Sequence, residues 1–282
     1  MNILQLSNTP LSNAPENLVR CLRDAGENAT LLLHRKTNRN RVFVGGTLYT
    51  ELPPGDLETL FRQADVLHFH NYAWDLQIFQ DHPHLLEIAR TKPALIQYHS
   101  PRRSQENFEP SLADKSLKHA VIAQYHVREY PECEFVVPNV IPIFATEYLP
   151  MGSKWRTPGP PVVSYAPSNT HLKGWDDKGW AFTAQILQQL ERRGAIIRDI
   201  ITNTPYEECL LRKRWAHIGV DEVVTGSYHL SSLEYLSMGC VTIARLDELT
   251  KQDLLSVVTG DPQHAAVTLP WHAVANVLQQ HR

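Results

Sequence analysis

The sequence lacks the features of several large protein classes. Its four cysteines lie far apart with no C-x-x-C pair, which argues against a disulfide scaffold and a cysteine zinc site. No apolar run approaches the ~20 residues that span a bilayer. The N-terminus begins directly with a strand-like segment and shows no basic region followed by an apolar stretch, as a secretion signal would. We therefore expect a cytoplasmic protein with reduced cysteines.

Several cofactor and catalytic motifs are absent as well. There is no G-x-G-x-x-G after the first apolar run and no G-x-x-x-x-G-K-[ST], which argues against a dinucleotide oxidoreductase and a P-loop NTPase. No Asp-x-Asp and no helical His, Asp or Glu cluster occurs, so we expect neither a metal ion nor a resident cofactor. No G-x-S-x-G marks a serine hydrolase. With 27 basic and 30 acidic residues, the net charge of -3 gives no global reason to expect a nucleic-acid or membrane-surface binder.

Short apolar runs alternate with amphipathic segments along the whole chain, which is typical of a parallel α/β sheet. The first half predicts strands at 3–6, 29–33, 66–69, 95–98, 121–123 and 135–137, and helices at 14–25, 56–63, 85–91 and 111–118. The second half predicts strands at 162–165, 196–201, 217–220 and 240–244, and helices at 175–193, 206–214, 231–238 and 271–280.

A segment rich in proline and glycine at 146–161 reads as a linker between these halves. The sequence therefore predicts two Rossmann-like domains, residues 1–148 and 149–282, that face a central cleft. In such a pair, strand carboxyl ends and helix N-termini converge on the ligand. We expect an enzyme acting on a nucleotide-linked substrate, with a two-domain binding protein without chemistry as the alternative.

The most informative segment runs from Thr225 to Ile243. It predicts a glycine-containing loop, a helix capped by Ser231 or Ser232, a stop at Gly239 and an apolar strand. A helix N-terminus of this kind suits a phosphate or diphosphate. Glu234, near the predicted helix start, could accept hydrogen bonds from ribose hydroxyls or could simply complement the helix dipole.

Five segments in order resemble GT-B-fold glycosyltransferases, in particular glycosyltransferase family 4: residues 64–71, 93–100, 136–141, 163–174 and 225–243. The segments 64–71 and 93–100 are predicted strands with histidines near their ends. The segment 136–141, around Pro138 and Asn139, precedes the crossover. The resemblance implies a metal-independent, retaining transfer from a nucleotide diphosphate sugar such as a UDP-sugar. It also implies that His99, after the second of these strands, contacts the donor sugar or supports the charge at its anomeric carbon.

The same resemblance assigns further residues. Those expected to bind the donor are Asn169, Lys173, His229, Ser231, Ser232 and Glu234, with Lys173 as the main cation on the diphosphate and Glu234 on the ribose. The chain departs from the family at Gly226, where the first of two glutamates would stand, and at Ser168, where an arginine would stand. The segment from Asn8 to Asn13, which includes Ser12, replaces a glycine-rich acceptor loop.

Cations gather at 34–41 and at Arg102 and Arg103, directly after His99. Both places follow predicted strands, so we expect them at one sheet edge, with Ser12 also on the acceptor side. The resemblance implies a hexosyl- or pentosyltransferase, and the placement of these cations predicts an anionic acceptor: a phosphate-bearing lipid or glycan, or a modified nucleic-acid base. A non-catalytic nucleotide-binding protein and a nucleotide-sugar epimerase remain as alternatives. His68 and His70 alternate along one strand, and we expect one to face the cleft and the other to pack against a helix.

Overall fold

The computed structural model describes residues 1–38, 41–102, 108–156, 158–167 and 179–259. The chain divides into two compact units, the first made of Met1–Ile122 and His126–Pro142, and the second of Ala123–Tyr125 and the residues from Ile143 on. The predicted division at residues 148 and 149 stays a prediction, as does the cleft between the two predicted domains.

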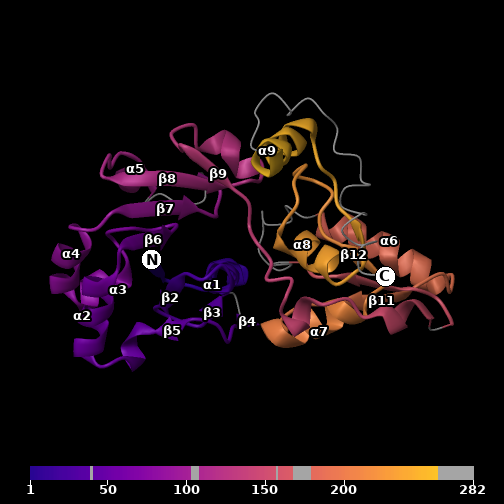
Figure 1. Cartoon of the computed structure of the whole chain (residues 1–282). Helices are drawn as coiled ribbons and strands as arrows, with labels where there is room; N and C mark the ends of the chain where they lie inside the picture. The colour runs from indigo at the N-terminus through magenta and orange to yellow at the C-terminus, as the bar shows by residue number, and fades with distance from the viewer. Residues whose placement is uncertain (39–40, 103–107, 157, 168–178, 260–282) are drawn as a thin grey trace. The chain divides into compact units, whose positions relative to one another are not determined.

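The first unit contains a seven-stranded parallel sheet, several strands of which are labelled in Figure 1, and its first strand, β1, has neighbours on both sides. Its order is β5-β2-β1-β6-β7-β8-β9, the Rossmann-type order, and every neighbouring pair is parallel. The strands are β1 (Asn2–Ser7), β2 (Asn28–Leu33), β5 (Thr47–Leu48), β6 (Val66–His70), β7 (Ala94–Tyr98), β8 (Leu117–Ile122) and β9 (Phe135–Val137). The predicted α/β class with a parallel sheet is therefore confirmed.

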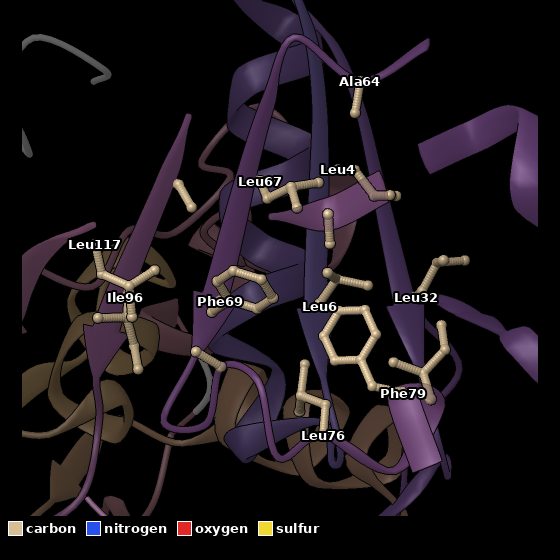
Figure 2. Close-up of a cluster of buried hydrophobic side chains, with 14 of the residues drawn as sticks. Leu4, Leu6, Leu32, Ala64, Leu67, Phe69, Leu76, Phe79, Ile96 and Leu117 are labelled. Atoms are coloured by element: carbon tan, nitrogen blue, oxygen red, sulfur yellow. The ribbon is translucent and has the colours of Figure 1, made fainter. Parts of the chain in front are cut away.

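Helices bury both faces of this sheet. On one face, Val19 of α1 (Ala14–Asp24) packs with Ile3 and Leu31. The other face holds the larger core, where Phe79 and Leu76 lie over Leu6 and its neighbours (Figure 2). Its helices are α2 (Pro54–Gln63), α3 (Gln77–Asp81), α4 (Pro83–Ala89) and α5 (Phe108–Leu112). Burial on both faces explains why these strands read as nearly continuous apolar runs.

The second unit contains a smaller parallel sheet in the order β11-β10-β12-β13. Its elements are β10 (Val162–Tyr165), α6 (Trp180–Arg192), β11 (Ile197–Ile200), α7 (Tyr206–Trp215), β12 (Ile218–Val220), α8 (Leu230–Ser237), β13 (Val241–Ile243) and α9 (Glu248–Thr259). Val163 and Tyr165 pack with Leu187 of α6. On β12, a Cβ at Gly219 would lie 2.1 Å from Cγ of Tyr235, so only glycine lets this ring approach the strand.

Several details differ from the sequence prediction, among them β5 and α3, which had not been predicted. The helix predicted at 111–118 is wrong, because Asp114 accepts hydrogen bonds from the backbone and hydroxyl of Ser116 and ends α5 before β8 begins. The basic run contains a short antiparallel pair, β3 (Thr37–Asn38) and β4 (Arg41–Val42). Helix α9 had not been predicted, and the helix predicted at 271–280 lies outside the described residues. Short 3-10 turns occupy Leu11–Asn13, Tyr49–Glu51, Tyr125–Glu129, Thr146–Tyr148 and Gly152–Arg156.

Candidate functional site

The order of the first sheet reverses beside β1, between β1 and β6. Ligands of parallel α/β sheets bind outside the strand carboxyl ends at such a switch point. β1 ends at Ser7 and β6 at His70, while β7, the neighbour of β6, ends directly before His99. His99 therefore lies at the carboxyl edge of the sheet, one strand from the switch point.

Polar side chains line one face of the sheet toward this edge. Gln5 is in register with His68, and His70 with Gln97, so these four residues share one face. All four are buried, Gln5 completely. The expectation that His68 and His70 have different surroundings is wrong: residues two apart on a strand share a face, and their ring centroids are 4.4 Å apart. A buried parallel sheet normally carries apolar side chains here, so this polar stripe indicates a site.

Three side chains form a hydrogen-bonded chain that ends at His99. Oε1 of Gln5 lies 2.8 Å from Nε2 of His70, and Nδ1 of His70 lies 3.0 Å from Nε2 of His99. His70 is buried, whereas His99 is partly exposed. Within the described parts of the chain, Nδ1 of His99 has no hydrogen-bond partner. The chain therefore begins in the interior and ends on a ring atom available to a ligand.

Burial keeps these histidines neutral. Burial, together with a smaller repulsion from the nearby His68 and His126, lowers the pKa of His99 to about 3. Burial lowers the pKa of His68 to about 4 against a hydrogen bond with Gln97 that raises it. The pKa of His70 is also well below its ordinary value, again mainly through burial. At neutral pH each ring thus has one N–H donor and one acceptor nitrogen.

Asn71 fixes the loop that carries His99. Its φ of 66° lies in the left-handed region, which asparagine adopts more readily than most residues. Its Oδ1 accepts a hydrogen bond of 2.6 Å from the backbone of His99, and its Nδ2 donates to the hydroxyl of Ser100 at 3.1 Å. The Tyr130 hydroxyl donates to the Ser100 carbonyl at 2.7 Å. These bonds tie the loop after β7 to the end of β6.

The prediction that Arg102 binds an anionic acceptor does not fit the structure. Its guanidinium forms two 2.7 Å hydrogen bonds with Glu109 and donates to Glu132 at 2.9 and 3.1 Å. Its backbone N–H donates to Glu129 at 2.7 Å. Because two carboxylates neutralise its charge, Arg102 anchors this loop instead of attracting an anion. Arg103 lies outside the described residues.

Ser12 lies on the loop between β1 and α1, at the switch-point edge of the sheet. Leu11, Ser12 and Asn13 have φ values of 45°, 58° and 75°, a run of left-handed residues without glycine. Each such residue costs about 1–3 kcal/mol, and strain of this kind clusters at functional sites. The exposed Ser12 side chain is placed suitably for a ligand, and its role in acceptor binding stays a prediction.

Two buried acids follow β12 in the second unit, where that sheet reverses its order. The carboxylate of Glu222 accepts backbone hydrogen bonds of 2.8–3.1 Å from Val224, Thr225 and Ser227. The Thr225 hydroxyl also donates to it. Gly226 in this loop has a φ of 77°, and a Cβ there would lie 2.8 Å from a carboxylate oxygen of Asp247. The loop is thus shaped around Glu222 and requires glycine where the resembling family has glutamate.

The other acid, Asp221, occupies the N-terminus of α8. Its Oδ2 accepts hydrogen bonds from the backbone of His229 at 2.7 Å and from the hydroxyl of Ser232 at 2.6 Å. The predicted cap is wrong, because His229 is the N-cap, while Ser231 and Ser232 lie in the first turn. The Ser231 hydroxyl accepts from Nζ of Lys213 at 2.9 Å. A carboxylate of the chain itself already compensates the positive helix end, so diphosphate binding by His229, Ser231 and Ser232 does not fit this geometry.

Glu234 is an internal ion-pair partner. No acidic residue lies in the first turn of α8, and the Glu234 side chain is 2 % exposed. One carboxylate oxygen pairs with Nζ of Lys213, which is equally buried, and the other accepts a 2.6 Å hydrogen bond from the Tyr206 hydroxyl. That hydroxyl lies 3.0 Å from the hydroxyl of Tyr148. The predicted ribose contact is therefore corrected, since both oxygens are occupied inside the unit.

The remaining predicted donor residues, Asn169 and Lys173, lie outside the described residues. Gln5, Asn71 and Glu222 were not among the residues predicted for the site. A glutamine inside the apolar run of β1 was the available signal for the first, and an asparagine directly after β6 for the second. Nothing in the sequence distinguished the buried Glu222 from a solvated loop acid.

No group of three or more His, Cys, Asp or Glu residues could hold a metal ion in the described part of the chain. Metal independence stays a prediction. No described helix is long and apolar enough to cross a membrane.

No protein-family model matches the sequence, and no curated protein matches it. Among solved structures, the chain is similar to sucrose-phosphate synthase from Thermosynechococcus elongatus, with a TM-score of 0.42 and 11 % identity, over 99 % of this chain and 98 % of that one. A likeness of this degree assigns no activity. The parallel α/β architecture is established by the strands of this chain itself.

Proposed function

We propose that this protein is a glycosyltransferase of the two-domain GT-B type, which transfers a sugar from a nucleotide diphosphate sugar to an acceptor. The observation that carries the proposal is the place of His99. It follows β7, one strand from the switch point of a Rossmann-type sheet, and the strand that β7 resembles in the family also ends in an active-site histidine. The ordered resemblance of the other four segments supports the same activity.

In this proposal His99 contacts the donor sugar. A neutral ring does not repel the positive charge that develops at the anomeric carbon as the glycosidic bond breaks, and burial keeps the ring neutral. Its Nδ1, which has no partner among the residues that the structure describes, can accept a hydrogen bond from a sugar hydroxyl. We assign Lys173 to the departing nucleoside diphosphate. Glu234 and the N-terminus of α8 are left out of the donor site because Lys213 and Asp221 occupy them.

An anionic acceptor, either a phosphate-bearing lipid or glycan or a modified nucleic-acid base, remains part of the proposal. Because Arg102 is paired with glutamates, Arg103 is the remaining cation near His99 in the sequence that we propose attracts an anionic acceptor. If the acceptor is anionic, raising the ionic strength increases its apparent KM, and Arg103→Ala reproduces that increase at low salt. Kinetics that do not change with salt in either protein would rule an anionic acceptor out.

A panel of nucleotide sugars tests the activity itself. Slow release of nucleoside diphosphate from one member, without added acceptor, is the result expected of a transferase. Conversion of one sugar into another would instead identify a nucleotide-sugar epimerase. Binding without turnover across the panel would identify the non-catalytic alternative, which the glycine at Gly226 would favour.

A further inference from the structure

We propose that Gln5 and His70 fix the tautomer of His99, so that His99 presents an unprotonated Nδ1 to a hydrogen-bond donor of the ligand, such as a sugar hydroxyl. Gln5 and His70 are then positioning residues that act through His99. The consequence for turnover rests on the proposed function, whereas the tautomer itself does not.

The polarity of the chain starts at Gln5. In the structure the amide oxygen of Gln5, which only accepts hydrogen bonds, faces His70 with Oε1 2.8 Å from Nε2. This orientation of the amide places the proton of His70 on Nε2. A neutral imidazole has a single N–H, so Nδ1 of His70 is left as an acceptor. The buried amide of Gln5 therefore determines which nitrogen of His70 donates a hydrogen bond and which one accepts.

The hydrogen bond between His70 and His99 then determines which nitrogen of His99 is protonated. Nδ1 of His70 lies 3.0 Å from Nε2 of His99 and needs a donor, so the proton of His99 sits on Nε2. Nδ1 of His99 then bears a lone pair. That atom has no protein partner in the described part of the chain, so its lone pair is directed to a ligand or to water.

A purely structural role explains the chain poorly. Nε2 of Gln5 and Nε2 of His68 are buried without a hydrogen-bond partner among the described residues, so apolar side chains would satisfy this interior better. The backbone of His99 is already held by Asn71. The hydrogen bonds from Gln5 through His70 determine in addition which nitrogen of the His99 ring carries the proton.

Long-range 1H–15N correlation spectra of the full chain, labelled with 15N-histidine, identify the protonated nitrogen of each ring. Signals of His70 and His99 are assigned from the spectra of His70→Ala and His99→Ala. At pH 7.5 we expect both histidines to carry the proton on Nε2. A proton on Nδ1 of His99 in the wild-type protein would overturn the proposal without any further variant.

Gln5→Met tests the origin of the polarity, since methionine fills similar space and offers His70 no comparable acceptor. We expect it to give a population of His99 protonated on Nδ1. Gln97→Met is the matched control, because Gln97 is a buried glutamine on the same face of the sheet whose side chain hydrogen-bonds His68 and takes no part in the hydrogen bonds that join Gln5, His70 and His99. Unchanged tautomers in a folded Gln5→Met protein, or equal changes in both variants, would overturn the proposal. Should Gln5→Met not fold, the wild-type spectrum still decides.

Turnover of the donor separates this proposal from the proposed function. We expect Gln5→Met to lower kcat by about tenfold or more with little change in KM, and Gln97→Met to retain more of it. The expected tautomers together with no turnover of any nucleotide sugar would leave the tautomer assignment intact and refute the glycosyltransferase. Turnover of a nucleotide sugar by a wild-type protein whose His99 carries the proton on Nδ1 would refute the tautomer assignment and support the glycosyltransferase.

Discussion

Removing the carboxylate of Glu234 should destabilise the second unit strongly. In Glu234→Leu, Nζ of Lys213 stays buried without its ionic partner, and the Tyr206 hydroxyl loses an acceptor. Breaking a buried ion pair by removing one partner costs about 3–5 kcal/mol. With an m-value of about 2–3 kcal/mol per molar urea, the unfolding midpoint falls by about 1–2.5 M.

The double variant Glu234→Leu/Lys213→Met is the control for this prediction. Replacing both members of a buried ion pair by apolar residues of similar volume is often nearly neutral, so this protein should recover most of the lost stability. Urea unfolding of the full chain, followed by circular dichroism, measures both variants beside the wild type. A Glu234→Leu protein of unchanged stability that no longer binds nucleoside diphosphate would refute this reasoning and restore the ribose contact.

Three further predictions concern the first unit. Asn71→Ala keeps the left-handed backbone and loses two hydrogen bonds, so the free energy of unfolding measured in urea should fall by about 2–3 kcal/mol. Asn71→Gly should lose about 1 kcal/mol less, because glycine adopts a positive φ without strain. Equal losses in the two variants would contradict backbone strain at this position. Because burial lowers the pKa of His68 to about 4, the unfolded chain takes up the proton first as the pH falls below 6.5. The free energy of unfolding should therefore fall between pH 6.5 and 4, by up to about 1.4 kcal/mol per pH unit for this residue, and less steeply in His68→Gln; identical slopes would refute this. Arg102→Ala should lower Tm, since partly exposed ion pairs contribute about 0.2–1 kcal/mol each, and should leave the salt dependence of turnover unchanged; a higher acceptor KM at unchanged stability would contradict it.

Most strands and helices could be predicted because each depends on a local pattern. The strand at Val162–Tyr165 has the predicted bounds, and Gly239 ends α8 with a φ of 68°, as its place after the apolar helix indicated. The helix predicted at 111–118 failed because a turn around Asp114 competes with helical bonding there. The order of the sheets depends on contacts between distant segments, which no local pattern contains.

The site could be predicted only in part, for the same reason. The position of His99 after an apolar strand was visible in the sequence, because loops at strand carboxyl ends are local features. The roles of Arg102 and Glu234 were not, because their charges are neutralised by partners far along the chain, such as Glu132 and Lys213. A charged side chain looks the same in a sequence whether it faces a ligand or an internal partner.

The proposed action of His99 on a sugar donor, at the carboxyl edge of the first sheet, can be measured through the kinetics of His99→Ala. His119→Ala is the matched control, since His119 is a buried histidine on the opposite face of the sheet whose Nε2 lies 3.1 Å from the Asp114 carbonyl oxygen. If His99 acts on the donor, His99→Ala lowers kcat for donor turnover about a hundredfold or more, with donor Kd nearly unchanged, whereas His119→Ala keeps its kcat. A His99→Ala protein that keeps its kcat and loses only thermal stability, as His119→Ala would, would show that His99 has no role in turnover.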